Sequence, residues 1–321
     1  MAKRAALFLC TFLVLYVFDF FIPRLMPGDP LQYTSSSSGE DMDGAFSAEQ
    51  LAQLRAYYGL DQPVGRQFLA TVARNLRGDL GQSIHYKMPV ARLIAQRLPW
   101  TLGLMAAAIA LSLAAGVALA LLCVRRKWAD RVLYPFFSAI CEVPPYLVGL
   151  LLLFCVAARV AWLPLSGGQT AFAQYAGPAQ RLADLALHAL LPLAALCVAT
   201  VPGFFFTARA SFLSVLGQPY LVMAQAKGLR EGRVRWAYIL RNAAAPILAK
   251  LFLSVGGLVG GALLVENVFA YPGLGTVLRE AVRYRDYPLI QGVFLLSALL
   301  VLCSMLAADA LGRRADRGAG A

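Results

Sequence analysis

The residues that could do chemistry in this sequence are four carboxylates set within or beside long apolar runs. They are Asp19, Glu142, Glu266 and Asp309. A carboxylate at membrane depth is costly, and such residues commonly serve a solute, an ion or a proton. Asp19 and Asp309 stand near the ends of their runs, where they can reach the membrane surface. Glu142 and Glu266 are candidates for lining a polar path, and a structural salt bridge or a place at the interface stays open for both.

No motif for covalent, nucleotide or metal chemistry accompanies these carboxylates. The sequence contains no G-x-x-x-x-G-K-[ST] loop, no HExxH and no GxSxG. The 6 cysteines lie in or at the ends of apolar runs without zinc-type spacing, and there are only 2 histidines. We therefore expect no catalytic, cofactor-binding or metal-ligating residues. Any ATP that the protein consumes must be hydrolysed by another chain.

Long apolar runs position these carboxylates. Hydrophobic residues make up 60% of the 321-residue chain, compared with about 45–50% in typical soluble proteins. Three runs carry no charge and three further candidates are less clean: 100–124, 185–208 and 288–308, then 5–21, 132–160 and 248–265. About 20 apolar residues span the hydrocarbon core, and a spanning segment of this kind must be helical. The sequence therefore predicts an all-α integral membrane protein with about six transmembrane helices.

The net charge of +12 follows the expected topology. With the N-terminus in the cytoplasm, the cytoplasmic segments are 1–4, 123–131, about 211–247 and 312–321, and all are rich in Lys and Arg. The outer loop 26–98 holds equal numbers of basic and acidic residues. This is the positive-inside pattern, with both termini cytoplasmic. Contact with anionic lipid or a cytoplasmic partner is a second role for the basic residues, and nucleic acid is not expected.

The loop between the first two spans has helix signals of its own. Ser47 is an N-cap candidate for a helix that Gly59 can end in a left-handed conformation. A second helix is expected from Pro63 to Gly78. We expect a small helical lid or scoop on the outer face.

Prolines mark two weak points within the spans. Pro144 and Pro145 stand beside Glu142 in the third span, and Pro202-Gly203 lies in the fourth. Proline removes a backbone hydrogen bond and kinks a helix. A broken helix at membrane depth is tolerated where it is packed in protein or lines a cavity, so Pro144 and Pro145 join Glu142 as possible pathway-lining residues.

Residues 217–247 form a polar, basic interruption between two spans. We expect a helix over 220–227, a sharp turn at Gly228 and a second helix over 231–245 that stops near Pro246. A helix-turn-helix of this kind offers a docking surface for another protein.

The fifth span carries glycine at small-xxx-small spacing, at positions 256, 257, 260 and 261. Such spacing lets helix backbones approach closely. A seam between subunits and packing within this chain are equally good interpretations.

Short motifs are distributed in one order along most of the chain. They are Met26-Pro27-Gly28-Asp29-Pro30, Gly59-Leu60-Asp61-Gln62-Pro63, Arg77-Gly78-Asp79-Leu80-Gly81-Gln82-Ser83, Pro89-Val90, Arg97-Leu98-Pro99-Trp100-Thr101-Leu102, Arg209 to Tyr220, Ala224-Gln225-Ala226-Lys227-Gly228-Leu229, Leu240-Arg241-Asn242-Ala243, Tyr271-Pro272-Gly273-Leu274-Gly275 and Arg285-Asp286-Tyr287-Pro288-Leu289-Ile290-Gln291-Gly292. With these motifs the sequence resembles, nearly end to end, the first permease subunit of the dipeptide/oligopeptide/nickel class of bacterial binding-protein-dependent ABC importers.

The resemblance implies a type I importer permease fold in the bacterial inner membrane. It implies as partners a second homologous permease, two ATP-binding subunits that hold ATP and Mg²⁺, and an extracytoplasmic substrate-binding protein. In this family the EAA loop docks on the ATPase, which assigns that role to Ala224, Ala226, Lys227, Gly228 and Leu229. Dipeptides, oligopeptides, nickel or other metal chelates, and opines all stay open as solutes.

The expected organisation has three parts. Residues 1–98 hold the first span and the outer segment, 99–312 form the permease domain with the EAA loop at about 211–247, and 313–321 are a cytoplasmic tail. The sequence departs from the family where Val222-Met223-Ala224 replaces the glutamate that names the EAA motif, and in the third-span segment that begins at Cys141.

Two other classes of function stay open. A secondary transporter driven by an ion gradient would use Glu142 and Glu266 as coupling sites, but no internal inverted repeat is seen. An intramembrane enzyme would need a catalytic constellation, which is missing from the sequence.

Overall fold

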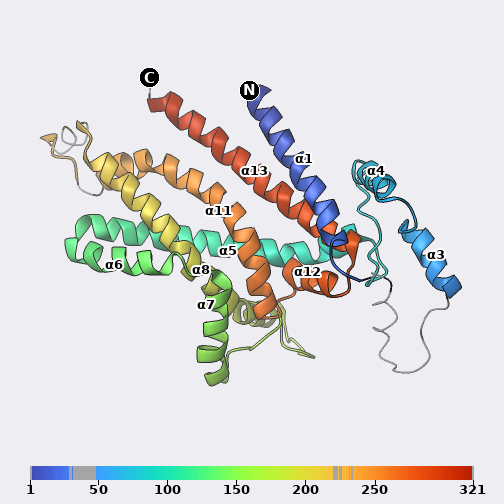
Figure 1. The fold of residues 1–321 in the computed structure, drawn as a ribbon. Helices are drawn as coiled ribbons and strands as arrows, with labels where there is room; N and C mark the ends of the chain where they lie inside the picture. Colours follow the sequence, from blue (N-terminus) through green and yellow to red (C-terminus); the bar gives the residue numbers. More distant parts are fainter. Residues whose placement is uncertain are drawn as a thin grey trace. The chain divides into compact units, whose positions relative to one another are not determined.

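A computed structural model describes residues 2–28, 31, 48–219, 223, 226–230, 232 and 234–319. This part of the chain is helical and contains no strand, only an isolated bridge between Gln82 and Pro89 (Figure 1). The chain divides into two compact units. The first holds Met1–Trp100 and Gly273–Leu299, and the second holds Thr101–Pro272 and Leu300–Ala321. The all-α prediction is confirmed.

In the described part of the chain, five helices are long and apolar enough to cross a membrane. They are α1 (Ala2–Arg24), α5 (Val90–Arg125), α8 (Pro178–Leu216), α11 (Arg241–Val268) and α13 (Tyr287–Ala319). A bent pair of helices brings the number to six if the pair forms one span. The predicted number of about six transmembrane helices is therefore confirmed.

The bent pair occupies the third predicted span. Helix α6 (Lys127–Ile140) meets the helical segment Pro145–Arg159, which begins with α7 (Pro145–Leu151), at an angle of 98°. Pro144 is extended, with φ −60° and ψ 138°, because the following proline disfavours the α conformation. Short π and 3₁₀ turns, η1 (Leu152–Val156) and η2 (Ala157–Arg159), complete the segment. The predicted break at the proline pair is confirmed.

Two other prolines lie within continuous helices. Helix α8 runs without a break through Pro202, where the sequence marks a weak point. The prediction that a helix stops near Pro246 is wrong, because α11 runs through this residue. Ala243 and Ile247, on either side of Pro246, are buried in a hydrophobic cluster. Packing on both sides of a proline offsets the one backbone hydrogen bond that it removes. A π-helix, η3 (Val234–Leu240), comes directly before α11.

The segment between the first two spans contains the two predicted helices. They are α3 (Ala48–Tyr58) and α4 (Val64–Asn75). Gly59 and Gly78 follow them with φ of +66° and +78°. Glycine adopts this left-handed conformation without steric cost, which explains why both helices end where they do.

Helix α4 is tied to the end of α1. The Arg24 guanidinium donates to Gln67 Oε1 from Nε at 3.2 Å and from a terminal nitrogen at 3.1 Å. Asn75 Nδ2 donates to the Tyr16 hydroxyl at 2.9 Å. These polar contacts fix the helical segment to its neighbouring span.

A buried carboxylate, Asp286, organises the first unit. Its Oδ2 accepts hydrogen bonds from Ser83 Oγ at 2.5 Å and from the His85 backbone N–H at 3.0 Å. Its Oδ1 accepts the Leu289 N–H at 3.2 Å, which makes Asp286 the N-cap of α13. Burial raises the pKa of Asp286 above its ordinary value, and the donated hydrogen bonds oppose that rise.

The neighbouring residues extend this anchor to helix α12 (Leu274–Arg283). The Tyr86 hydroxyl donates to Glu280 on α12, and the His85 ring stacks on Tyr284 with centroids 3.9 Å apart. Burial, followed by the hydrogen bond to Glu280, raises the pKa of Tyr86. The turn at 83–87 is therefore held against both α12 and α13.

Two glycine contacts complete the same region. A Cβ at Gly28 would lie 3.0 Å from Arg285 Cζ, and a Cβ at Gly292 would lie 2.6 Å from Val90 Cγ1. Residues from several of these short motifs thus meet in one place, although they are far apart in the sequence.

The second unit packs around a buried cluster on α5, α6, α8, η3 and α11. The closest approach is at Gly116 on α5, where a Cβ would lie 2.7 Å from Phe204 Cβ and 2.9 Å from the Phe205 backbone nitrogen. Both phenylalanines are fully buried.

Replacing Asp286 with alanine should lower the free energy of unfolding by about 3 kcal/mol, because buried donors lose their acceptor. The measurement is unfolding of the purified protein in detergent. Asp79 is the matched control, since its exposed carboxylate accepts one hydrogen bond, from the Gly81 N–H at 2.9 Å. Asp79→Ala should cost less than about 1 kcal/mol. Equal losses would contradict the anchoring role of Asp286.

Gly116→Ala should destabilise the protein by about 1–3 kcal/mol, because the new methyl group forces a shift in α8. Gly103 lies on the same helix, and a Cβ added there would have nothing within 4 Å of it. Gly103→Ala should leave stability unchanged or slightly improved. The same unfolding measurement compares the two variants, and a larger loss for Gly103→Ala would refute the close-packing explanation.

Candidate functional site

A pocket of about 320 Å³ lies where the α6–α7 break faces α8 and α11. We call it the bend pocket, and its lining includes Cys141, Glu142, Pro144, Pro145, Gly203 and Lys250. Three of the four residues that were predicted to line a path, Glu142, Pro144 and Pro145, therefore share one hollow. Their part in a path stays a prediction.

Glu142 lies in the turn between α6 and α7 with its side chain exposed. The Cys141 thiol donates to Glu142 Oε1 at 3.6 Å. Behind them, Pro145 packs on α11, where a Cβ at Gly261 would lie 3.1 Å from Pro145 Cγ. The proline pair thus turns the chain, and the glycine lets the turn rest directly on α11.

Lys250 is a site residue that sequence analysis missed. It lies on α11 and lines the bend pocket opposite the α6–α7 turn. A Cβ at Gly203 on α8 would lie 3.0 Å from Lys250 Cε and 3.2 Å from Nζ, so the glycine leaves the room that this side chain occupies. The sequence contains one indication of this residue: Lys250 is the single charged residue in the run 248–265. From the sequence alone, this run was interpreted only as a less clean hydrophobic segment.

The glycine-rich stretch of α11 serves more than one purpose. A Cβ at Gly256 would lie 3.3 Å from Val301 Cγ1 on α13, and Gly261 contacts α7. Gly257 and Gly260 have nothing within 4 Å of the same position. Packing within this chain therefore accounts for two of the four glycines, and the other two face open space.

Glu266, the fourth predicted residue, lies elsewhere. It is fully buried near the end of α11 and does not line the bend pocket. The Tyr271 N–H donates to its backbone carbonyl at 2.8 Å. Burial, and next the charge of Glu266, raises the pKa of Tyr271. The structure therefore separates Glu266 from Glu142.

The predicted docking segment includes a left-handed turn. The Lys227 N–H donates to the Met223 carbonyl at 3.1 Å, as in a helix. Gly228 then has φ +68°, and a Cβ added there would have nothing within 4 Å of it. Ala226, Lys227 and Gly228 are exposed, so the turn is open to a partner.

Leu229 connects this turn to the interior. It is half-buried and packs against the hydrophobic cluster of the second unit. Ala224, also predicted to dock, lies outside the described residues. The sharp turn at Gly228 was correctly predicted from the sequence; the packing of Leu229 was not.

An ion pair braces the helices beside this segment. Arg209 on α8 donates to Asp130 on α6 from Nε at 2.5 Å and from a terminal nitrogen at 2.7 Å. The guanidinium carbon also lies 4.9 Å from the Tyr134 ring centroid. Bidentate geometry of this kind fixes orientation as well as distance.

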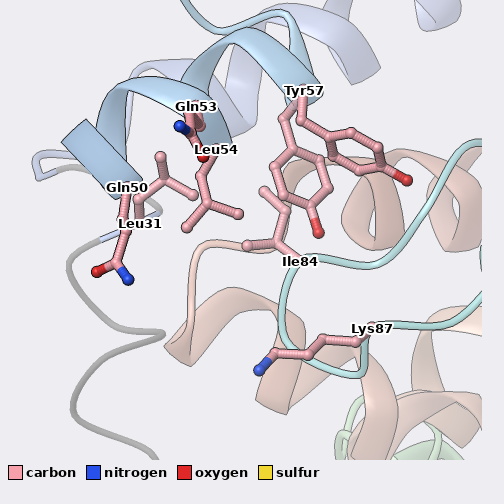
Figure 2. A pocket seen from close by; sticks show the side chains of 8 residues that line it. Leu31, Gln50, Gln53, Leu54, Tyr57, Ile84 and Lys87 are labelled. Carbon is pink, nitrogen blue, oxygen red and sulfur yellow. The ribbon is translucent and has the colours of Figure 1, made fainter. Parts of the chain in front are cut away.

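A second hollow, of about 540 Å³, belongs to the first unit. Figure 2 shows α3 presenting Gln50, Gln53, Leu54 and Tyr57 toward it, with Ile84 and Lys87 on the facing turn. The lining is mostly apolar with a few polar groups. It lies in the helical segment between the first and second spans.

Membrane-length helices surround a pocket that contains both an acidic and a basic side chain. Residues 108–320 match the family described as the binding-protein-dependent transport system inner membrane component. The chain belongs to this family and is a multi-pass permease subunit of an ABC importer.

Named relatives cover nearly the whole chain. A probable peptide ABC transporter permease (y4tP) of Sinorhizobium fredii is 33% identical over 90% of this chain and 89% of its own length. The glutathione transport system permease GsiC of Pectobacterium atrosepticum is 33% identical, over 96% and 94%. The oligopeptide transport system permease AppB of Bacillus subtilis is 31% identical, over 96% and 95%.

Among solved structures, the inward-facing MetNI methionine ABC transporter shares the fold. The match has a TM-score of 0.50 and 18% sequence identity, and it covers 70% of this chain and 95% of that chain. The expected importer permease fold is thereby confirmed.

Glu142→Gln should lower solute uptake several-fold without changing the thermal midpoint, because the side chain is exposed in the pocket. Glu266→Gln should instead lower the thermal midpoint, because the fully buried carboxylate has interaction partners that an amide of the same shape does not satisfy equally. Uptake by cells and unfolding of the purified protein test the pair. Unchanged uptake in Glu142→Gln would remove it from the path, and reduced uptake at normal stability in Glu266→Gln would return that residue to it.

Proposed function

We propose that this chain forms half of the translocation path of an ATP-driven importer and docks on a separate ATPase through the turn at Gly228. The observation that best supports this proposal is the exposed, left-handed turn at Gly228, which is connected to the hydrophobic interior through Leu229. The family membership supports the same assignment.

The proposed assembly contains a second homologous permease, two ATP-binding subunits and an extracytoplasmic substrate-binding protein. The sequence has no phosphate-binding loop, so ATP and Mg²⁺ belong to the ATP-binding subunits. The basic segments support a cytoplasmic position for both termini and for the Gly228 turn.

Coupling then follows from rigid connections. Ala224, Ala226, Lys227 and Gly228 form the docking surface, and Leu229 carries its displacement into the buried cluster. The Arg209–Asp130 ion pair keeps α6 and α8 together as they move. Because α8 and α11 also line the bend pocket, a movement of the turn reaches the pocket through continuous helices.

The bend pocket is this chain's share of the path, with Glu142, Pro144 and Pro145 on its wall. Glu266 has a structural role, because it is fully buried and does not line this pocket. The outer segment with the hollow of Figure 2 provides the surface that meets the substrate-binding protein.

The solute is a peptide or a related compound. The relatives are named for peptides, glutathione and oligopeptides, which favours this class over nickel and other metal chelates or opines. The pocket volume of about 320 Å³ is at the small end of ligand pockets, roughly 300–1,000 Å³.

Gly228→Asp should abolish uptake while leaving the chain in the membrane. Aspartate tolerates the left-handed conformation better than most residues, and none of the described residues lies within 4 Å of the new Cβ. A loss of uptake with normal membrane insertion therefore points to a partner. Uptake and the amount of membrane-inserted protein are the two measurements.

Gly78 supplies the folding control, since it has φ +78° and the same open surroundings. Gly78→Asp should leave membrane levels within about twofold of wild type, as should Gly228→Asp. Normal uptake by Gly228→Asp would contradict the docking role. Labelling of Lys227→Cys from outside the cell, with Lys87→Cys reacting only from inside, would overturn the orientation.

A further inference from the structure

Lys250 places a positive charge deep within a membrane helix. It comes nine residues after Arg241, the first residue of α11, and so lies about 14 Å further along the helix axis. Gly203, its neighbour on α8, comes six residues before Arg209, or about 9 Å along that helix. The hydrocarbon core is about 30 Å thick, so this ammonium is well below the surface that the arginines mark.

The ammonium has no counter-ion within the described part of the chain. Neither a hydrogen bond nor an ion pair of its Nζ occurs among these residues. Arg209, nearer the end of its helix, is by contrast bidentate to Asp130. A cation at membrane depth is costly unless an anion or water compensates it. Lys250 therefore needs a counter-charge that the described part of this chain does not provide.

The surroundings show that this arrangement is built rather than incidental. Gly203 provides the space over which the lysine stem lies. Glu142 lines the same pocket from the α6–α7 turn, yet forms no ion pair with Lys250 in the described residues. One acid and one base therefore stand on different walls of one hollow, and both are open to a third molecule.

We propose that Lys250 binds a carboxylate of the transported solute, while Glu142 faces its cationic amine. This inference rests on the proposed function and adds the side chains that recognise the charged groups of the solute. The solute is a zwitterion about the size of a dipeptide, because the pocket of about 320 Å³ is at the lower end of small-molecule sites.

Cys141 offers a native probe of binding, since its exposed thiol lines the same pocket. The experiment follows alkylation of Cys141 by a maleimide in permeabilised membranes that contain the assembled importer. Mass spectrometry reads this one site, because Cys10, Cys155 and Cys303 are also exposed. The competing probes are alanyl-alanine and its C-terminal amide, which lacks the carboxylate.

Alanyl-alanine should slow the alkylation of Cys141 in the wild-type protein. The amide should need a concentration about tenfold higher or more for the same protection, because it loses a charge-assisted hydrogen bond. Lys250→Met should remove this preference, and Lys250→Arg should keep it. Methionine suits a membrane helix, and the thermal midpoint of each variant verifies folding.

Three results would overturn the proposal: no protection by alanyl-alanine, equal protection by both probes in the wild type, or a preference that survives Lys250→Met. The first is also the result expected if an acid of a partner subunit neutralises Lys250.

Uptake separates this inference from the proposed function. If deletion of the chain leaves uptake of alanyl-alanine intact, the importer role for that solute fails. If deletion abolishes uptake but Lys250→Met transports normally, only the carboxylate-binding role fails. Under the proposal, deletion abolishes uptake and Lys250→Met lowers it about tenfold.

Discussion

Close approach of helices at glycine is the constraint on which the second unit depends. Helices in lipid gain little from the hydrophobic effect when they associate, so van der Waals contact must hold them together. Gly116 admits Phe204 to the surface of α5, Gly149 admits Phe269, and Gly261 admits Pro145. The last contact has a functional consequence, because it seats the α6–α7 turn on α11 and so gives the bend pocket its wall. At Gly203 the same device makes room for a charged side chain instead of an apolar one.

The first unit is held by a different kind of interaction. Asp286 gathers hydrogen bonds from a turn about 200 residues earlier in the sequence and also caps α13. A buried acceptor of this kind is specific, since each donor is costly to leave without a partner. Contacts at Gly28 and Gly292 bring further motif residues to the same place. Several of the motifs, from residues 26–30 to residues 285–292, are thus parts of one anchor, although they stand far apart in the chain.

Features that depend on neighbouring residues in the sequence were predicted correctly. The apolar runs became spans, Gly59, Gly78 and Gly228 took left-handed conformations, and Pro144-Pro145 broke the third span. Local sequence rules failed where packing between helices overrode them. Pro202 and Pro246 stay within continuous helices, because buried neighbours hold the backbone on both sides. The positions of Glu266 and Lys250 were not predictable for the same reason: a sequence gives the depth of a charged residue in a span, but only packing decides whether it faces a cavity or the interior.

Among the described residues, charged side chains are paired in the structural part of this permease and unpaired in the proposed path. Arg209 is neutralised by Asp130 within the chain, which suits a brace that must keep one geometry. A path has the opposite requirement, because a solute must be bound well enough to enter and weakly enough to leave. A permanent ion pair between Glu142 and Lys250 would satisfy the membrane but exclude a charged solute. Glu142 lies on a turn and Lys250 on a helix, with Gly203 beside the lysine, so both charges line one pocket without pairing with each other. This arrangement leaves both charges available to the proposed solute.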